Sequence, residues 1–348
     1  MEKKRVVVGM SGGVDSSVAA WLLKEQGYEV IGVHMNFWQE KCAFDASNDA
    51  ARTADEIGIP FYVMDFKEEF KRNVVDYFVK EYICGRTPNP CIVCNRYVKW
   101  EALLKRSKEL GAEYIATGHY ARVLKRANGR YTLAFSGTKA KDQTYALYHL
   151  TQEQLSHTLM PIGEYTKEEI RSIAEKIGLN TADKPDSQEI CFIPDHDHAG
   201  FIERMAGEDT PKGGNFVTAD GQILGRHEGI THYTIGQRKG LNLALGRPVF
   251  VTKICPDTNE VVIGEAEDVF AKEFIADHIN YMGVENITDG MRFLTKIRYA
   301  HKGAVAALYK EKDGKIRFVF DEKQRAITPG QSAVFYDGDC IAGGGVIL

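Results

Sequence analysis

A run of seven residues near the N-terminus, Ser11-Gly12-Gly13-Val14-Asp15-Ser16-Ser17, has the composition of a phosphate-binding loop. It follows the apolar run Val6–Val8 and precedes apolar residues at helical spacing, so the expected order is strand, glycine turn, helix. Paired glycines let backbone amides approach an anion without a Cβ in the way, and a helix N-terminus adds roughly half a unit of positive charge. Serine hydroxyls can donate to phosphate oxygens, and the Asp15 carboxylate can hold Mg²⁺. The run therefore predicts a site for the phosphates of a nucleotide.

This loop differs from the two commonest nucleotide motifs. A Walker loop requires a lysine before its final Ser or Thr, and none stands there. The Rossmann fingerprint Gly-x-Gly-x-x-Gly is also missing. The motif instead resembles the PP-loop of the ATP pyrophosphatases, which cleave ATP to AMP and pyrophosphate and use the AMP to activate an oxygen atom. An ordinary glycine turn is the alternative, but the full motif between a strand and a helix favours the phosphate site.

A second group of reactive residues is a Cys-x-x-Cys pair, Cys91 and Cys94, which follows the stiff segment Arg86-Thr87-Pro88-Asn89-Pro90. The next helix is expected to begin near Tyr97, so a thiol ahead of it, with basic residues nearby, is expected to have a lowered pKa. A third cysteine, Cys191, lies far along the chain. A zinc half-site and a lone redox pair are the alternatives, although no second ligand pair completes a zinc site. The remaining cysteines read as core or surface residues: Cys42, Cys84, Cys255 and Cys340.

Composition limits the kind of protein. The 348 residues allow two or three domains, and 44% hydrophobic with 26% charged residues is typical of a soluble globular chain. No signal peptide or membrane-spanning stretch is recognisable, and seven unevenly scattered cysteines argue against a disulfide framework, so a cytoplasmic location is expected. The net charge is −4, yet residues 86–141 carry an excess of nine positive charges. That excess fits a solvated surface and a phosphate-tracking surface about equally well.

The positioning elements are expected to lie in three domains. Residues 1–199 should form an α/β domain with a mostly parallel sheet, whose ligands bind at the carboxyl ends of the strands. Its predicted strands are Val6–Gly9, Glu29–Met35, Phe61–Asp65 and Tyr114–Thr117, with a hairpin at Ala121–Ser136 and a helix capped by Thr166 and ended by Gly178. Residues 200–268 are glycine-rich and read as a small irregular domain. Residues 269–348 are strand-rich, and four predicted strands could close into a small β-barrel: Arg292–Tyr299, Val305–Tyr309, Ile316–Phe320 and Ser332–Tyr336.

Five motifs in a fixed order carry a family resemblance. SGGVDSS, GRTPNPCIVCNRYVKW, ATGHYAR, KDQTYALY and DSQEICFI resemble the bacterial tRNA-specific 2-thiouridylases, the MnmA or TrmU family, over essentially the whole chain. The resemblance implies a PP-loop domain, a small central domain and a C-terminal barrel. It also implies ATP-dependent replacement of the C2 oxygen of the wobble uridine by sulfur, in tRNAs such as those for Lys, Glu and Gln.

The chemistry implied by this resemblance has two halves. The uracil C2 oxygen attacks the α-phosphate of ATP, giving an adenylated base from which AMP can leave, while Mg²⁺ screens the pyrophosphate charge. Cys191 is implied to carry a persulfide from a donor such as a cysteine desulfurase or a relay protein. Cys94 attacks that persulfide, releasing sulfide or yielding a Cys94–Cys191 disulfide that must later be reduced.

The resemblance also assigns residues to the other parts of the site. The nucleotide site is implied to contain Gly9, Met10, Ser11, Gly12, Gly13, Val14, Asp15, Ser16, Ser17, Met35 and Gly118. The flipped target base is implied to lie against Asn89, Pro90 and Cys91. Contacts to tRNA are implied for His119, Lys141, Asp142, Gln143, Arg298, Tyr299 and Gln331.

Three alternatives stay open at this point. Because some members have Asp where this chain has Cys91, the thiols of Cys91, Cys94 and Cys191 could instead ligate an iron–sulfur cluster that delivers sulfide. A different PP-loop AMP-forming synthetase would need an ammonia source, and no glutaminase-like segment is present. A non-catalytic tRNA-binding protein would not need an intact nucleotide loop and both cysteines.

Overall fold

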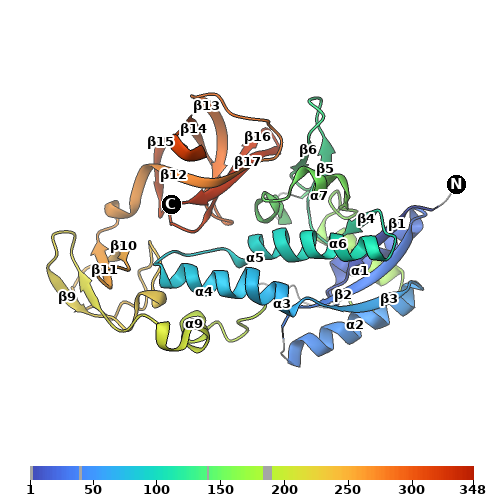
Figure 1. The fold of residues 1–348 in the computed structure, drawn as a ribbon, viewed down its shortest axis with the longest axis horizontal. Coiled ribbons are helices and arrows are strands. Elements are labelled where there is room, and N and C mark those ends of the chain that lie inside the picture. The colour runs from blue at the N-terminus through green and yellow to red at the C-terminus, as the bar shows by residue number, and fades with distance from the viewer. Residues whose placement is uncertain (1–2, 39–40, 139–140, 183–189) are drawn as a thin grey trace.

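The computed structural model describes residues 3–38, 41–138, 141–182 and 190–348 (Figure 1). An α/β unit comes first, a small sheet unit follows it, and a β-barrel ends the chain. Among these described residues no helix is both long and apolar enough to cross a bilayer.

Five strands form the central sheet of the α/β unit, in the order β3-β2-β1-β4-β7, and every neighbouring pair is parallel. This confirms the predicted mostly parallel sheet. Val6 and Val8 point to one face of the sheet and Val7 to the other, and all three are fully buried because helices cover both faces. The strands are β1 (Arg5–Gly9), β2 (Glu29–Asn36), β3 (Phe61–Asp65), β4 (Tyr114–Ala116) and β7 (Thr158–Leu159).

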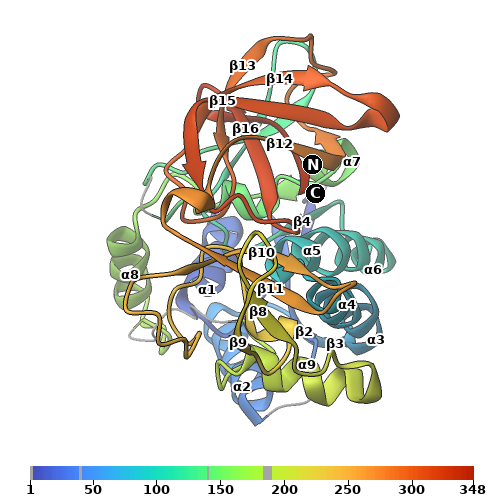
Figure 2. The same ribbon diagram turned by 90° about the vertical axis from the view of Figure 1, so that its left-hand side faces the viewer.

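Helices cover both faces of the central sheet. The layer over Val6 and Val8 consists of α1 (Val14–Glu25), α2 (Lys41–Ile57) and α8 (Lys167–Lys176), and Figure 2 shows α1 and α8 on one flank. The layer over Val7 comprises α3 (Lys67–Phe70), the π-helical η1 (Lys71–Val75), α4 (Asp76–Ile83), α9 (His198–Ala206) and the run from Pro90 to Glu109. As predicted, Thr166 caps α8, in a capping box with Glu169, and Gly178 follows the helix at a φ of 74°.

The helical run that carries the Cys-x-x-Cys pair begins at Pro90, so the predicted start near Tyr97 is wrong. It comprises α5 (Pro90–Val93), the π-helical η2 (Cys94–Ala102) and α6 (Leu103–Glu109). The Asn89 side chain accepts from the Cys91 N–H at 3.1 Å, and Pro90 occupies the first helical position. Proline there loses no hydrogen bond and its fixed φ suits the helix, so Asn89-Pro90 starts the helix rather than delaying it.

The second unit is a four-stranded sheet with its own small core. Its order is β10-β11-β8-β9, and Phe216, Val251, Val261 and Ile263 are buried within it. The strands are β8 (Asn215–Val217), β9 (Ile223–Arg226), β10 (Phe250–Cys255) and β11 (Glu260–Gly264).

The third unit is a six-stranded barrel, which closes because β12 pairs with both β15 and β17. The prediction of a barrel is confirmed, but only four of these strands were expected. The strand β17 contains Gly343-Gly344-Gly345, a composition depleted in strands, and here glycine is required because a Cβ on Gly343 would lie 2.6 Å from the Asn280 carbonyl oxygen. The strands are β12 (Phe270–Tyr281), β13 (Met291–Lys296), β14 (Ala304–Lys310), β15 (Ile316–Arg325), β16 (Ser332–Asp337) and β17 (Cys340–Ile347).

A hairpin of the first unit joins the barrel. Strands β5 (Arg122–Lys125) and β6 (Tyr131–Ala134) form the predicted hairpin (Figure 1). Strand β6 pairs with β17 at Ala134 and Cys340. Arg130 donates to the Met282 carbonyl at 3.0 Å, and Thr132 donates to the Ile341 carbonyl at 2.7 Å. The α/β unit and the barrel are therefore held together by backbone pairing as well as by side chains.

His149 lies where the helical run meets the barrel, and its titration should make stability depend on pH. Its ring stacks on Tyr148 with centroids 5.3 Å apart. Burial, helped by the charges of Arg96 and His278, lowers the pKa of His149 to about 4. In the unfolded chain the His149 imidazole has a pKa of 6.5. Between pH 6.5 and pH 4 this imidazole is therefore protonated in the unfolded chain but neutral in the folded one.

The contribution of His149 to the free energy of unfolding is thus complete above about pH 6.5 and is lost as the pH falls toward 4. Between pH 7 and pH 5 this amounts to about 2 kcal/mol. We expect His149→Phe, which keeps a ring for stacking on Tyr148, to remove that loss. Urea unfolding of both proteins at pH 7 and pH 5 measures it, and an equal loss in the variant would contradict the assignment.

Candidate active site

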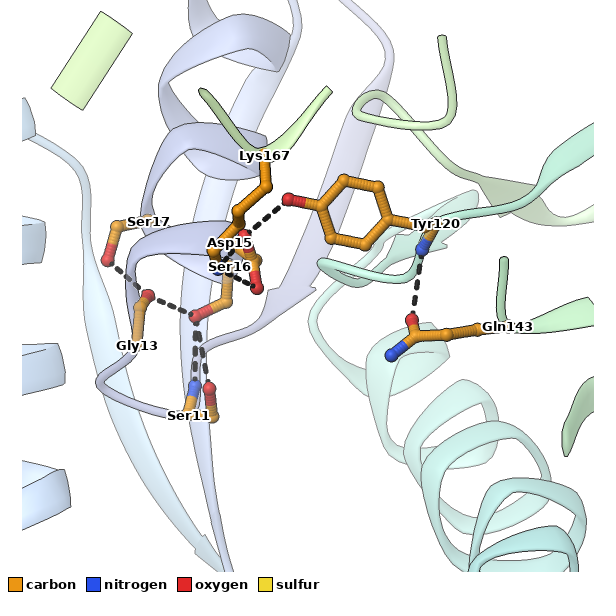
Figure 3. Close-up of polar contacts among 8 residues, drawn as sticks. All are labelled: Ser11, Gly13, Asp15, Ser16, Ser17, Tyr120, Gln143 and Lys167. Carbon is orange, nitrogen blue, oxygen red and sulfur yellow. Dashed lines mark hydrogen bonds and ion pairs between the residues drawn. The ribbon is translucent and has the colours of Figure 1, made fainter. Parts of the chain in front are cut away.

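The predicted phosphate loop lies at the carboxyl end of β1 and leads into α1 (Figure 3). Gly12 has a φ of 77°, and a Cβ there would lie 2.5 Å from the Ala46 carbonyl oxygen, so only glycine fits. Gly13 is the N-cap of α1 and provides no side-chain cap. The first N–H groups of α1 are thus not capped by a side chain, and together with the helix dipole they suit an anion. The loop has the features that a nucleotide phosphate requires.

The serines of the loop fix its shape. Ser16 Oγ accepts from the Ser11 N–H at 3.2 Å and donates to the Gly13 carbonyl at 3.1 Å, while Ser17 Oγ donates to that carbonyl at 2.9 Å (Figure 3). Ser16 and Ser17 are buried, whereas Ser11 is exposed. The two buried hydroxyls hold the turn, and Ser11 lies at its open edge.

Two other residues predicted for the nucleotide site lie beside the loop. Met35 is near the end of β2, and its Cε lies 3.1 Å from the position that a Cβ on Gly9 would occupy. Gly118 follows β4 and lies directly against the start of α1. The carboxyl ends of three neighbouring strands therefore bring Gly9, Met35 and Gly118 together, as expected for a parallel sheet.

Gly118 offers a direct test of this packing. A Cβ at Gly118 would lie 2.6 Å from the Ser16 nitrogen and 2.7 Å from the Asp15 carbonyl carbon, and neither backbone atom can move without shifting α1. We expect Gly118→Ala to weaken ATP binding by at least tenfold, through about 1.4 kcal/mol or more of strain at the loop. Calorimetric titration with ATP measures it, and thermal unfolding of the variant checks that the fold is retained. Unchanged affinity in Gly118→Ala would show that the nucleotide does not use this loop.

The Asp15 carboxylate is engaged by other side chains rather than open to a metal ion. Lys167 Nζ lies 2.8 Å from both carboxylate oxygens, and the Tyr120 hydroxyl donates to Oδ1 at 2.7 Å (Figure 3). The Lys167 side chain is only 9% exposed, so the ammonium is held in place against the carboxylate. Both carboxylate oxygens of Asp15 are thus engaged by protein groups, and the Mg²⁺ role predicted for Asp15 stays a prediction.

The cysteines predicted for sulfur chemistry differ in accessibility. Cys91 and Cys191 are exposed, whereas Cys94 is buried. Burial raises the pKa of Cys94 to about 12, although the Lys99 ammonium opposes the shift. The predicted lowering of the pKa is wrong, because Cys94 lies inside the helical run rather than ahead of it and its side chain is packed in the core. In this conformation Cys94 is a buried, protonated thiol.

The three thiols nevertheless share one region. Negative charge on Cys191 or on Cys91 would raise the pKa of Cys94 further, so both lie within its electrostatic range. Among the described residues, no three His, Cys, Asp or Glu side chains are arranged to hold a metal ion. The iron–sulfur cluster considered for Cys91, Cys94 and Cys191 therefore stays a prediction. Part of the motif that contains Cys191, residues 186–189, lies outside the described residues.

The loop after β4 connects the nucleotide site to the cysteine region. Gly118 contacts α1, and the next residue, His119, lies 5.4 Å from Trp100 of η2, ring centroid to centroid. His119 shares a 2.7 Å hydrogen bond with Thr117, and its pKa is well below the ordinary value because of burial and the charge of Lys99. Lys99 thus lies within electrostatic range of both His119 and Cys94. The loop after β4 and the helix η2 therefore connect the phosphate loop to the cysteine region.

The remaining residues predicted for tRNA contact divide into two groups. Gln143 is used inside the fold, because its Oε1 accepts from the Tyr120 N–H at 3.0 Å. Asp142 accepts from Thr144 at 2.6 Å, and burial raises its pKa. Lys141 is half-buried next to them, at the edge of the described residues.

The barrel contributes the second group. Tyr299 is 49% exposed and its hydroxyl donates to the Asp142 carbonyl at 3.2 Å, while a charged Cys91 would raise its pKa. Arg298 donates to the Arg325 carbonyl at 2.9 Å, and Gln331 Nε2 donates to the Thr87 carbonyl at 2.7 Å. Of these residues, Tyr299 presents the most open surface beside the cysteines.

Five arginines that contribute to the positive excess in residues 86–141 have partners within the structure. Arg86 pairs with Glu81, Arg106 with Glu69, and Arg126 with Asp337. Arg122 and Arg130 donate to backbone carbonyls of Phe135 and Met282. These contacts favour a structural role for the arginines over a phosphate-tracking surface.

Sequence reasoning missed Lys167 and Tyr120, whereas Lys99 was expected near the thiols and lies within electrostatic range of Cys94. The capping box predicted the position of Lys167 in its helix, but not its contact with a carboxylate 152 positions earlier. Such pairs depend on how α1 and α8 pack, and a single sequence carries no signal for that.

Comparisons with known proteins cover the whole chain. Residues 4–195 match the family described as the tRNA methyl transferase HUP domain, residues 200–265 its PRC-barrel domain, and residues 271–347 the aminomethyltransferase beta-barrel domain. A relative from Lachnoclostridium phytofermentans, a tRNA-specific 2-thiouridylase MnmA, is 61% identical over 99% of both chains. Another of that name from Clostridium perfringens is 55% identical over 100% of this chain and 99% of its own. A solved U34-tRNA thiolase NcsA from Methanococcus maripaludis, with a 4Fe-4S cluster, aligns at a TM-score of 0.38 and 19% identity, covering 60% of this chain and 69% of that one.

Proposed function

Because the chain belongs to the tRNA-specific 2-thiouridylase (MnmA) family, as its relatives at 55–61% identity show, we propose a two-site mechanism for its reaction. The enzyme is a sulfurtransferase that 2-thiolates tRNA uridine, with ATP bound by a PP-loop. The matched domains are described as methyl transferase domains. Paired cysteines beside a phosphate loop support sulfur transfer instead, because methyl transfer requires neither.

The first half of the mechanism uses the loop Ser11–Ser17. The C2 oxygen of the wobble uridine attacks the α-phosphorus of ATP, the bond to the β-phosphate oxygen breaks, and pyrophosphate leaves. Backbone N–H groups at the start of α1 stabilise the phosphate charge, since no side chain caps them. The uracil C2 atom then carries AMP, a far better leaving group than oxide.

The second half uses the cysteines. Cys191, which is exposed, accepts a sulfur atom from a donor protein and becomes a persulfide. The Cys94 thiolate attacks the Sγ of Cys191, the S–S bond of the persulfide breaks, and hydrosulfide is released. Hydrosulfide attacks C2 and expels AMP, and the resulting Cys94–Cys191 disulfide takes two electrons from an external thiol reductant to reset the enzyme.

The observation that carries this proposal is the continuity from Gly118 through His119 to η2, which links the phosphate loop to the cysteine region. Asn89, Pro90 and Cys91 lie at the start of the same helical run, where an extruded base would meet Tyr299 of the barrel. Burial of Cys94 supports a mechanism in which tRNA binding opens this run before sulfur is transferred.

Thiolation of a wobble-uridine tRNA in vitro tests the proposal. The protein is supplied with ATP and a persulfide donor, pyrophosphate release is followed, and product tRNA is detected by its retardation in a mercury-containing gel. We expect thiolated tRNA only with ATP, at one pyrophosphate per sulfur. Pyrophosphate release without sulfur incorporation would favour a different AMP-forming synthetase, and tRNA binding with neither would favour a non-catalytic protein.

A further inference from the structure

All three units of the protein meet at one residue, Thr87, which lies just ahead of the cysteine-bearing helix. Its N–H donates to the Pro329 carbonyl of the barrel at 2.9 Å, and its carbonyl accepts from Gln331 Nε2 at 2.7 Å. Its hydroxyl donates to Thr234 Oγ1 of the middle unit at 3.4 Å. The barrel thus holds both backbone polar groups of a residue that belongs to another unit.

The turn that contacts Thr87 is shaped for this close approach. Gly330 has a φ of 87°, and a Cβ there would lie 2.9 Å from the Thr87 nitrogen. On the other side Arg86 donates to both carboxylate oxygens of the buried Glu81, at 2.7 and 2.5 Å. Thr87 is therefore fixed between an internal ion pair and the barrel turn 329–331.

The segment after Thr87 is stiff. Pro88 and Pro90 have fixed φ angles, and the residues before them, Thr87 and Asn89, are excluded from the helical region. Asn89 then caps the Cys91 N–H. A change in position at Thr87 is consequently passed to the start of the helix rather than absorbed on the way.

We propose that Gln331 is a positioning residue, which acts through Thr87 to hold the Asn89–Cys94 segment closed until tRNA engages the barrel. This differs from direct tRNA contact by Gln331, since its side-chain amide is already bonded to Thr87. The inference rests on the proposed function only in that Cys94 is the reacting thiol. The barrel itself does not depend on this bond, because six paired strands and the β5–β6 hairpin hold it.

The test compares Gln331→Met with a matched control, Gln324→Met. Methionine preserves the length of the side chain and cannot donate. Gln324 also lies in the barrel, but its amide bonds to the Glu322 carbonyl and to His301, within the barrel. Labelling of Cys94 by iodoacetamide, without ATP or tRNA, is followed by mass spectrometry, with half-buried Cys340 of β17 as an internal reference for the barrel.

We expect Cys94 in Gln331→Met to react about five- to tenfold faster than in the wild type, as loss of one hydrogen bond predicts. Cys340 should be unchanged, and Gln324→Met should match the wild type at both thiols. Because tRNA opens the segment in the wild type, kcat at saturating tRNA should not fall in Gln331→Met, and the Kd for tRNA should stay within twofold. Unchanged Cys94 labelling, equal acceleration at Cys340, or a rise in the Kd for tRNA beyond twofold would each overturn the proposal.

One variant separates this inference from the proposed function. Full thiolation by Cys94→Ser would refute the role of Cys94 in the reaction, whereas the labelling experiment would still judge whether Gln331 holds the segment.

Discussion

Cys191→Ser is expected to abolish 2-thiouridine formation while leaving tRNA-dependent pyrophosphate release within about threefold of wild type. The serine hydroxyl cannot form a persulfide, so sulfur delivery stops, and the phosphate loop that performs the first step lies elsewhere. Loss of a covalent carrier typically costs several orders of magnitude, so thiolated tRNA should fall below detection over at least a thousandfold range. Mercury gels and pyrophosphate release on the same samples measure both steps.

A matched control and a rescue sharpen this test. Cys255→Ser changes a cysteine of the middle unit, half-buried in β10, and should thiolate normally. Inorganic sulfide at millimolar concentration should partly restore thiolation in Cys191→Ser, because hydrosulfide can attack the adenylated base directly. Normal thiolation by Cys191→Ser with a persulfide donor would rule Cys191 out as the carrier.

Lys167→Met is expected to raise the Kd for ATP by ten- to a hundredfold. The Asp15 carboxylate, at the first turn of α1, would then lose the ammonium that lies 2.8 Å from both of its oxygens. An uncompensated negative charge beside the phosphate loop opposes the phosphates, and hydrogen bonds to charged groups contribute about 1.5–3 kcal/mol. Isothermal titration with ATP measures the change.

The double variant Asp15→Asn with Lys167→Met shows why ATP binding is weaker in Lys167→Met. If Lys167 acts by compensating Asp15, removing both charges should bring the Kd for ATP back to within about fivefold of wild type. A double variant as weak as Lys167→Met would show that Lys167 contacts the nucleotide itself or that Asp15 has a role of its own. Lys176→Met, on the exposed end of α8, is the matched control and should bind ATP normally.

Local sequence signals predicted the elements whose causes are local. The apolar run Val6–Val8 predicted β1, the helical spacing of the apolar residues after the loop predicted α1, the capping residues predicted α8, and Asn128-Gly129 predicted the β5–β6 hairpin. The phosphate loop was predicted from its own residues, whereas Met35 and Gly118 were assigned to the nucleotide site by the family resemblance; all lie at the carboxyl ends of parallel strands. The roles of the tRNA residues came from the family resemblance and remain proposals.

Features that depend on packing across long sequence distances were not predicted. The low pKa expected for Cys94 assumed a thiol ahead of a helix, but Asn89 and Pro90 start the helix earlier and turn Cys94 into the core. Strand β17 was missed because glycine is depleted in strands, whereas here close neighbours leave no room for a Cβ. These neighbours are the Asn280 carbonyl at Gly343, the Tyr148 ring at Gly344 and the Asp277 carbonyl at Gly345. The contact between Lys167 and Asp15 and the one between Gln331 and Thr87 join residues 152 and 244 positions apart.

The pairing of β6 with β17 limits how this protein can be divided. A fragment that stops before the barrel would leave the β6 edge uncovered, with its strand N–H and C=O groups open to pairing with other chains. The side chains of Arg130 and Thr132 would lose their carbonyl partners at the same time. Although the catalytic half looks self-contained in the sequence, it should aggregate when produced alone, and studies of isolated adenylation should retain all 348 residues.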